Sequence, residues 1–297
     1  MSPEVEKVAR RLAAAYAQLP VVRAVALGGS QATGLAAGDS DVDLYVYASP
    51  EPGLEARAAV AAGSPRRELG NRFFEPGDEW VDAETGLAVD AMFRDPSFIE
   101  GELDRVLVRC EARVGYSTAF WHGLVHSSSL YDPTGWYAAL QARARMPYPE
   151  PLVRAVVEKN QPLLRRNLSS FRAQLARAAA RGDAVSVNHR TAAFLASFFD
   201  VLFAVNRIPH PGEKRLLAVA EARCSRRPPE LARQVAALVS AAAHPGDGVV
   251  RCADALGEAL DRLLEHDGLL PAGPREPPAA NSPPARRGGR GRRAKDR

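Results

Sequence analysis

Apolar side chains recur at helical spacing over the first 19 residues of the chain. Ser2 and Pro3 stand at the start of this pattern, and these residue types favour the N-cap and the first position of a helix. The pattern therefore predicts an amphipathic helix that begins at Pro3 and ends before Pro20. The apolar run 21–27 follows, which predicts a buried strand that leads into a pair of glycines.

Three further segments have the short apolar or alternating pattern of strands, namely 42–47, 68–74 and 87–93. In the last segment four apolar residues occupy every second position and therefore share one face of the strand. The residues around Pro76 are typical of turns, so we expect a loop between the last two strands.

The periodicity changes to a helical one from about Pro96 onward. Strands in the first third of a chain and helices in the rest are typical of an α+β fold. We expect a head of strands and helices over 1–147, an α-helical domain over 148–270 and a tail over 271–297. The helices predicted beyond the head cover 150–181, 184–207, 213–223, 229–243 and 249–266.

The tail combines Pro, Gly, Ala and Arg with almost no large apolar side chain, so we expect it to be disordered. It carries eight basic and two acidic residues over 272–297, whereas the preceding residues carry a small acidic excess. The overall charge of +4 therefore belongs to the tail. We expect no nucleic-acid partner for the folded part, and leave open whether the tail is a solubilising or leftover extension or an arm that binds nucleic acid or an anionic surface.

Three cysteines lie far apart without a C-x-x-C pair, which indicates neither a disulfide framework nor a structural zinc site. The chain has no run of 18 apolar residues and does not begin like a secretion signal. We expect a cytoplasmic protein with no membrane partner.

The residues with the clearest chemistry are Gly28, Gly29 and Ser30, followed after ten residues by Asp41 and Asp43. A glycine pair directly after a strand lets the backbone approach a phosphate group closely, and Ser30 adds a hydroxyl donor. Side chains at i and i+2 of a strand point to the same side, so the two carboxylates converge. Convergent carboxylates beside a phosphate cradle predict a Mg²⁺ site for a nucleotide, with two ions in all.

A third carboxylate would complete such a site, and the chain offers two candidates. Asp90 lies inside a predicted strand, on the face opposite its apolar residues, whereas Asp82 follows Trp80 and Val81. We favour Asp90 because a strand beside 42–47 would bring it next to the first pair. The alternative interpretation of the whole motif is purely structural, namely a loop whose Gly, Ser and Asp residues form only local turns.

This motif resembles the signature of the DNA polymerase β-like nucleotidyltransferase superfamily, in the branch that includes aminoglycoside and lincosamide nucleotidyltransferases and the minimal nucleotidyltransferases. The resemblance implies a mixed sheet flanked by helices in the head. It implies that Gly28, Gly29 and Ser30 hold the triphosphate. It also implies that Asp41, Asp43 and Asp90 bind two Mg²⁺ ions.

A second resemblance covers 188–215, which is similar to the helical half of a family of bacterial nucleotidyltransferase-domain proteins whose substrate is not settled. In such helical domains a lysine often reaches back to the triphosphate. Lys214 follows Pro211-Gly212 at an expected helix start, and we take it as the candidate. Its alternative is an ordinary exposed lysine.

Several other residues have both a structural and a functional interpretation. Glu158 and Asp200 are candidate bases for an acceptor hydroxyl, although carboxylates on long helices are usually solvated or paired. Asn206 is expected to cap a helix rather than touch substrate. His122 and His126 lack the pattern of a zinc motif and are interpreted as ordinary polar positions. The phenylalanines at helical spacing are expected in the core, namely Phe194, Phe198, Phe199 and Phe203.

The leading functional hypothesis is a Mg²⁺-dependent enzyme that transfers a nucleoside monophosphate from an NTP, most simply ATP, to a hydroxyl of a small-molecule acceptor and releases pyrophosphate. One alternative is an enzyme that modifies a protein with AMP. A second alternative is a nucleotide sensor without catalysis, which the presence of all three carboxylates disfavours.

Overall fold

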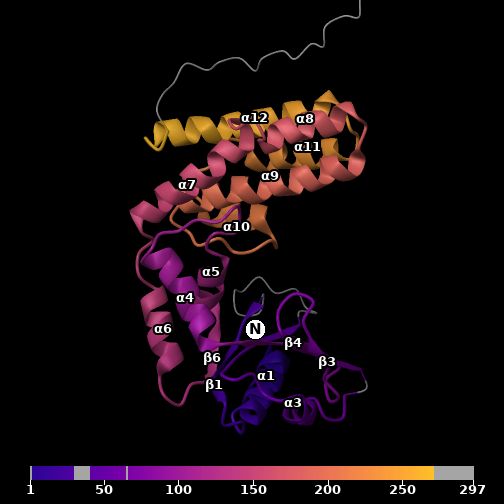
Figure 1. Ribbon diagram of the computed structural model, residues 1–297, viewed down its shortest axis with the longest axis vertical. Helices are drawn as coiled ribbons and strands as arrows, with labels where there is room; N and C mark the ends of the chain where they lie inside the picture. The colour runs from indigo at the N-terminus through magenta and orange to yellow at the C-terminus, as the bar shows by residue number, and fades with distance from the viewer. Residues whose placement is uncertain (1, 30–40, 65, 271–297) are drawn as a thin grey trace, which may run out of the picture.

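The computed structural model describes residues 2–29, 41–64 and 66–270. Its head contains a six-stranded sheet with the strand order β3-β4-β5-β2-β1-β6 (Figure 1). β2 and β5 are parallel and the other neighbours are antiparallel, so the sheet is mixed. The predicted α+β fold with a mixed sheet is confirmed. The strands are β1 (Val22–Leu27), β2 (Val42–Ala48), β3 (Arg67–Asn71), β4 (Gly77–Val81), β5 (Ala88–Arg94) and β6 (Ser128–Tyr131).

Helices cover both faces of this sheet. Alternate residues of β1 and β2 point to opposite faces, so Val25 and Leu44 pack with α1 (Pro3–Tyr16) while Ala26 and Tyr47 pack with helices that follow the sheet. The other helices of the head are α3 (Leu54–Val60), α4 (Pro96–Leu107), α5 (Ala119–His126) and α6 (Trp136–Ala144).

The start of α1 agrees with the sequence. The Ser2 hydroxyl accepts a hydrogen bond from the Val5 backbone N–H at 3.2 Å, and Pro3 is the first helical residue. The helix ends at Tyr16, earlier than predicted, because the chain tightens into a turn in which the Leu19 N–H bonds to the Tyr16 carbonyl.

A loop was expected around Pro76, and the chain does bend over 72–76, but this loop does not continue to the next predicted strand. β4 begins directly after it and pairs with both β3 and β5. Its sequence lacks the apolar pattern because Asp78 occupies a buried position, where the Arg57 guanidinium donates to it at 2.9 Å from Nε. A buried ion pair here stands where a strand would usually place an apolar side chain.

The rest of the described chain is helical and packs around α9 (Ala184–Val205) (Figure 1). The single helix predicted over 150–181 is two helices, because the chain turns before Ser170, whose hydroxyl caps the second one through the Ala173 N–H. The remaining helices are α7 (Glu150–Arg165), α8 (Phe171–Ala180), α10 (Leu216–Arg223), α11 (Leu231–Ala242) and α12 (Asp247–His266). None of the described helices is long and apolar enough to cross a membrane.

The helical part and the head share a core at α7. Leu152 and Val156 of this helix pack with Ala26 and Tyr47 from the second face of the sheet. The proposed boundary at residue 147 stays a prediction, as does the disorder of 271–297, which lie outside the described residues.

Candidate active site

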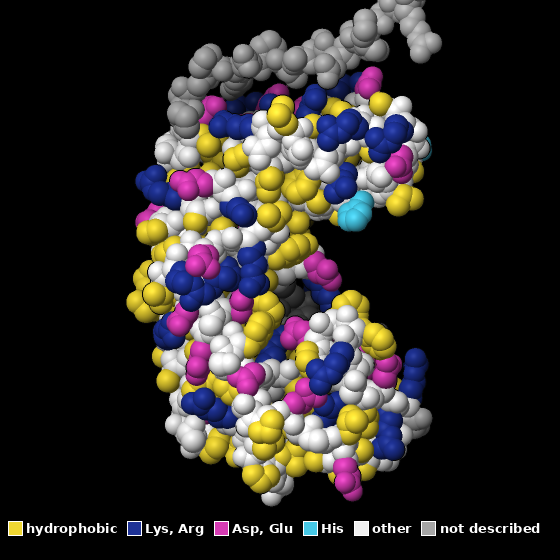
Figure 2. Space-filling view, in the orientation of Figure 1, with side chains coloured by type: hydrophobic (Ala, Val, Ile, Leu, Met, Phe, Trp, Pro, Cys, Tyr) yellow, Lys and Arg dark blue, Asp and Glu magenta, His cyan; other side chains and the backbone are white. Residues whose placement is uncertain are grey.

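A pocket of about 670 Å³ lies between the sheet and the segment that precedes α10. This size suits a small-molecule or cofactor ligand. Figure 2 shows the molecule hollowed on this side, between the head and the helical part. Its floor includes Gly29, Asp41, Asp43 and Asp90, and its opposite wall is formed by 211–215.

The parallel pairing of β2 and β5 brings two predicted site residues together. Asp43 is the register partner of Asp90, and both lie on the face opposite the apolar residues packed on α1. Asp41 lies just before β2, is exposed and lines the same pocket. All three carboxylates therefore line the same pocket, at one end of the sheet.

The acidic residues continue across the sheet. Asp90 also faces Glu79 of β4, which in turn faces Glu68 of β3. Like charges opposite one another on neighbouring strands repel. Burial, followed by the charges of Asp43 and Glu79, raises the pKa of Asp90 to about 6. Burial also raises the pKa of Asp43, Asp41 adds to this effect, and the charge of Lys214 opposes it.

The two glycines are required by close contacts with the strand beside them. A Cβ at Gly29 would lie 1.6 Å from Asp43 Oδ2, and the φ of +64° at this residue also favours glycine. A Cβ at Gly28 would lie 2.3 Å from the Tyr45 ring. Gly28 additionally donates its N–H to the Asp43 carbonyl at 2.8 Å. The glycines thus place the turn directly against the carboxylate; Ser30, the third residue of the predicted cradle, lies outside the described residues.

Lys214 lines the pocket from the wall opposite the strands. Burial raises the pKa of Asp43, and the positive charge of Lys214 opposes this rise. It does not begin a helix as expected, because α10 starts at Leu216 after Arg215, whose φ of 55° is left-handed. The structure therefore places a cation across the pocket from the carboxylates, on a segment between two helices.

α5 supplies a third wall that the sequence did not predict. His122, interpreted from the sequence as an ordinary polar residue, is buried and lines the pocket. Its ring stacks on that of His126 at 4.0 Å between centroids, and the His126 Nδ1 donates to the His122 carbonyl at 2.9 Å. Burial, with the His126 and Arg223 charges, lowers the pKa of His122 to about 3, which keeps this imidazole neutral at pH 7. The only sequence signal was the spacing of two histidines by four residues.

Arg94 is another pocket residue that the sequence analysis missed. It lies on the same face of β5 as Asp90, and it donates to the Glu75 carboxylate at 2.7 Å and 3.0 Å. Its guanidinium lies over the Tyr45 ring at 4.1 Å. Strand alternation alone could have placed Arg94 on the face of Asp90. This paired arginine forms part of the pocket floor together with Tyr45 and Glu75.

The competing carboxylate, Asp82, is used elsewhere. It accepts hydrogen bonds from the Thr85 N–H at 3.1 Å and the Thr85 hydroxyl at 2.8 Å, and it forms an ion pair with Arg11. The bonds from Thr85 and Arg11 lower its pKa despite the opposing effect of burial. Asp82 therefore has a structural role at the end of β4, and it does not line the pocket.

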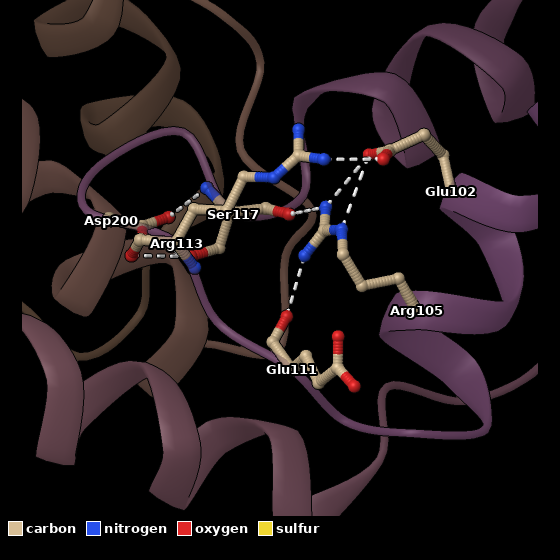
Figure 3. A network of polar contacts seen from close by, with 6 residues as sticks. All are labelled: Glu102, Arg105, Glu111, Arg113, Ser117 and Asp200. Atoms are coloured by element: carbon tan, nitrogen blue, oxygen red, sulfur yellow. Dashed lines mark hydrogen bonds and ion pairs between the residues drawn. The ribbon is translucent and has the colours of Figure 1, made fainter. Parts of the chain in front are cut away.

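Asp200 lies in a polar network that joins the head to α9 (Figure 3). It accepts from the Ser117 N–H at 3.0 Å, the Ser117 hydroxyl at 2.6 Å and the Asn160 amide at 3.2 Å. Arg105 of α4 extends this network by donating to the Ser117 carbonyl at 2.7 Å and to Glu102. Asp200 is buried away from the pocket lining, so it joins the two parts of the molecule rather than facing a substrate.

The other helical candidates also have structural settings. Glu158 is exposed on α7 and does not line the pocket. Asn206 caps α9, since it donates to the Leu202 carbonyl at 2.8 Å and accepts from the Arg226 N–H at 2.9 Å, which confirms the expected capping role. The expected core position is confirmed for the phenylalanines of α9, namely Phe194, Phe198, Phe199 and Phe203.

Among the described residues, no group of three His, Cys, Asp or Glu side chains is arranged closely enough to hold a metal ion by itself. The crowded carboxylates nevertheless offer the hard oxygen donors that Mg²⁺ prefers. Burial raises the pKa values of Asp43 and Asp90, neighbouring carboxylates add to the rise, and a bound cation would oppose it.

Residues 5–105 match the family model of the nucleotidyltransferase domain. This match contains the glycine pair and all three carboxylates, and it ends before α5 and Lys214. The head therefore carries a nucleotidyltransferase domain, and the protein is an enzyme of the nucleotidyltransferase class.

Solved structures of nucleotidyltransferases share a weaker likeness with the chain. A nucleotidyltransferase-like protein from Exiguobacterium sibiricum is 13% identical, with a TM-score of 0.42 over 89% of this chain and 76% of that one. The Thermotoga maritima CCA-adding enzyme, solved with tRNA, is 12% identical, with a TM-score of 0.33 over 89% and 82%. No curated protein matches significantly. Since both TM-scores are below 0.5, the assignment rests on the family match.

Proposed function

We propose that this nucleotidyltransferase moves a nucleoside monophosphate from a nucleoside triphosphate, with ATP as the expected donor, to a hydroxyl group of a small-molecule acceptor. Pyrophosphate is the second product. The observation that carries the proposal is the register pairing of Asp43 with Asp90 at the floor of a pocket whose opposite wall presents Lys214.

Asp41, Asp43 and Asp90 would hold Mg²⁺, in two ions with the nucleotide phosphates and water as the remaining ligands. When bound, the ions supply charge neutralisation at the phosphates and activation of the attacking hydroxyl. The donor set fits this role because the carboxylates repel one another in the absence of a cation.

The order of the strands supports different roles for the two ends of the pocket. Gly29 follows β1 on one side of Asp43, and Asp90 lies on β5 on the other side. The glycine turn and Lys214 bind the triphosphate, so the acceptor approaches from the side of Asp90. A bond forms between the acceptor oxygen and the α-phosphorus, and the bond from that phosphorus to pyrophosphate breaks. The hydroxyl proton passes to a carboxylate oxygen of Asp90.

The test is transfer of label from α-labelled ATP in Mg²⁺ to a panel of hydroxyl compounds. We expect transfer by the unaltered protein and its loss in Asp43→Asn. Glu158→Gln is the matched control, because this carboxylate is exposed and outside the pocket, and it should leave the rate unchanged. Absence of transfer to every acceptor with every divalent metal would refute the proposal, whereas label on a polypeptide would replace the small-molecule acceptor with a protein.

A further inference from the structure

Few hydrogen bonds hold the segment that carries Lys214 in place. Between Ile208 and Arg215, hydrogen bonds to described residues are made only at His210 and Gly212. The His210 backbone N–H donates to the Thr118 hydroxyl at 2.7 Å, and the Gly212 N–H donates to His210 Nδ1 at 3.1 Å. His210 takes part in both bonds.

The His210 side chain is fixed by its surroundings. It is fully buried, and its ring meets the rings of Tyr116 and Phe203 edge-on at 4.8 Å and 5.2 Å between centroids. Because Nδ1 accepts a hydrogen bond, the neutral ring carries its proton on Nε2. Burial lowers the pKa of His210 to about 4, which maintains this form at neutral pH.

The bond from Gly212 also closes a tight turn of the backbone. The φ of Gly212 is 98°, a conformation that side chains rarely adopt, and Lys214 follows two residues later. Thr118, the partner of the His210 N–H, is the N-cap residue of α5, which carries His122 in the pocket. His210 thus connects the two walls, because its backbone N–H bonds to Thr118 of α5 and its imidazole accepts the bond from Gly212 in the wall formed by 211–215.

We infer that His210 is a positioning residue for nucleotide binding, which holds the turn at Gly212 so that Lys214 faces the carboxylates. This inference rests on the proposed binding of the triphosphate by Lys214. His210 itself does not line the pocket and acts only through the segment that it anchors.

The test compares two replacements of His210 by calorimetric titration of each full-length protein with ATP in Mg²⁺. His210→Phe keeps a ring between Tyr116 and Phe203 but removes the acceptor for the Gly212 N–H. His210→Asn keeps an acceptor close to the position of Nδ1. Loss of one net hydrogen bond predicts a Kd for MgATP roughly two- to tenfold higher in the Phe variant. We expect the Asn variant to recover at least part of this loss.

The same comparison in a Lys214→Ala background separates positioning from general damage to the fold. If His210 acts through Lys214, the Phe replacement has no further effect once the lysine is absent. Either of two results would overturn the inference and leave the proposed function intact. One is that His210→Phe binds MgATP as well as the unaltered protein does. The other is that the Phe replacement weakens MgATP binding equally with and without Lys214. An unaltered protein that does not bind MgATP would overturn both the inference and the proposed function.

Discussion

Replacement of Asp90 by Asn should make the metal-free protein more stable at neutral pH while it abolishes nucleotidyl transfer. Asp90 faces Asp43 on one side and Glu79 on the other, and it is partly buried. In the absence of a cation, its negative charge is repelled by both neighbours. Asparagine has nearly the same shape and carries no charge, so the repulsion disappears with little change in packing.

The magnitude follows from the pKa of Asp90, which is raised from 3.8 to about 6. Two pKa units correspond to about 3 kcal/mol of free energy of unfolding at pH 7, where the carboxyl is charged in both states. Because Asp90 is only half-buried, screening by solvent reduces the expected gain to about 1 kcal/mol. For a protein of this size the melting temperature should rise by about 2–4 °C.

The pH dependence gives the sign of the effect. A raised carboxyl pKa means that the folded state holds the proton more tightly, so its stabilising contribution is complete below pH 3.8 and is lost as the pH rises through about 6. The difference in free energy of unfolding between Asp90→Asn and the unaltered protein should therefore be near zero at pH 4 and largest above pH 6.

Urea denaturation in EDTA at several pH values measures this difference. Asp82→Asn is the matched control, because Asp82 has a lowered pKa and pairs with Arg11, so its replacement should destabilise the protein. Saturating MgATP should stabilise the unaltered protein and not Asp90→Asn, so in its presence the unaltered protein should have the higher free energy of unfolding. An Asp90→Asn variant that is less stable than the unaltered protein at pH 7 in EDTA would refute the reasoning.

Gly29→Ala should reduce nucleotidyl transfer roughly 100-fold, because its Cβ would displace the Asp43 carboxylate by direct overlap, and steady-state rates with ATP measure the loss. The lowered pKa of His122 makes a contribution to stability that is present above pH 6.5 and is lost as the pH falls toward 3. Between pH 7 and pH 5 the free energy of unfolding of His122→Gln should therefore fall by about 2 kcal/mol less than that of the unaltered protein. Equal falls in urea titrations would contradict this. Asp200→Asn should cost about 1–3 kcal/mol in the same assay, since an amide cannot accept all the bonds from Ser117 and Asn160, and unchanged stability would show that this network is dispensable.

The carboxylates of the site were predictable from local rules. The spacing of Asp41 and Asp43 at i and i+2, and the alternation around Asp90, determine which face of a strand each side chain occupies. The direct pairing of Asp43 with Asp90 depends on the neighbours of β2 in the sheet. A strand pattern contains no information about its partner, so this contact had to come from the structure.

Residues that reach the pocket through packing between distant segments were missed. His122 enters it because α5 packs beside the sheet, with Gly123 close to Tyr45. Glu79 faces Asp90 only because β4 exists, and the buried pair of Asp78 with Arg57 hid that strand from the apolar pattern. In both cases the arrangement depends on contacts between residues that are far apart in the sequence. Hydrophobic periodicity contains no information about such contacts.

The pocket takes its parts from widely separated stretches of the chain, and this has a consequence during synthesis. The glycine turn and the carboxylates are translated well before the segment 211–215 that forms the facing wall. A nascent chain that has folded only its head therefore displays an acidic groove without its lysine. The facing wall is added to the groove only after α9 has left the ribosome and the segment behind it has docked on Thr118. Ribosome-bound chains of increasing length should acquire MgATP binding in one step, after residue 215 has emerged.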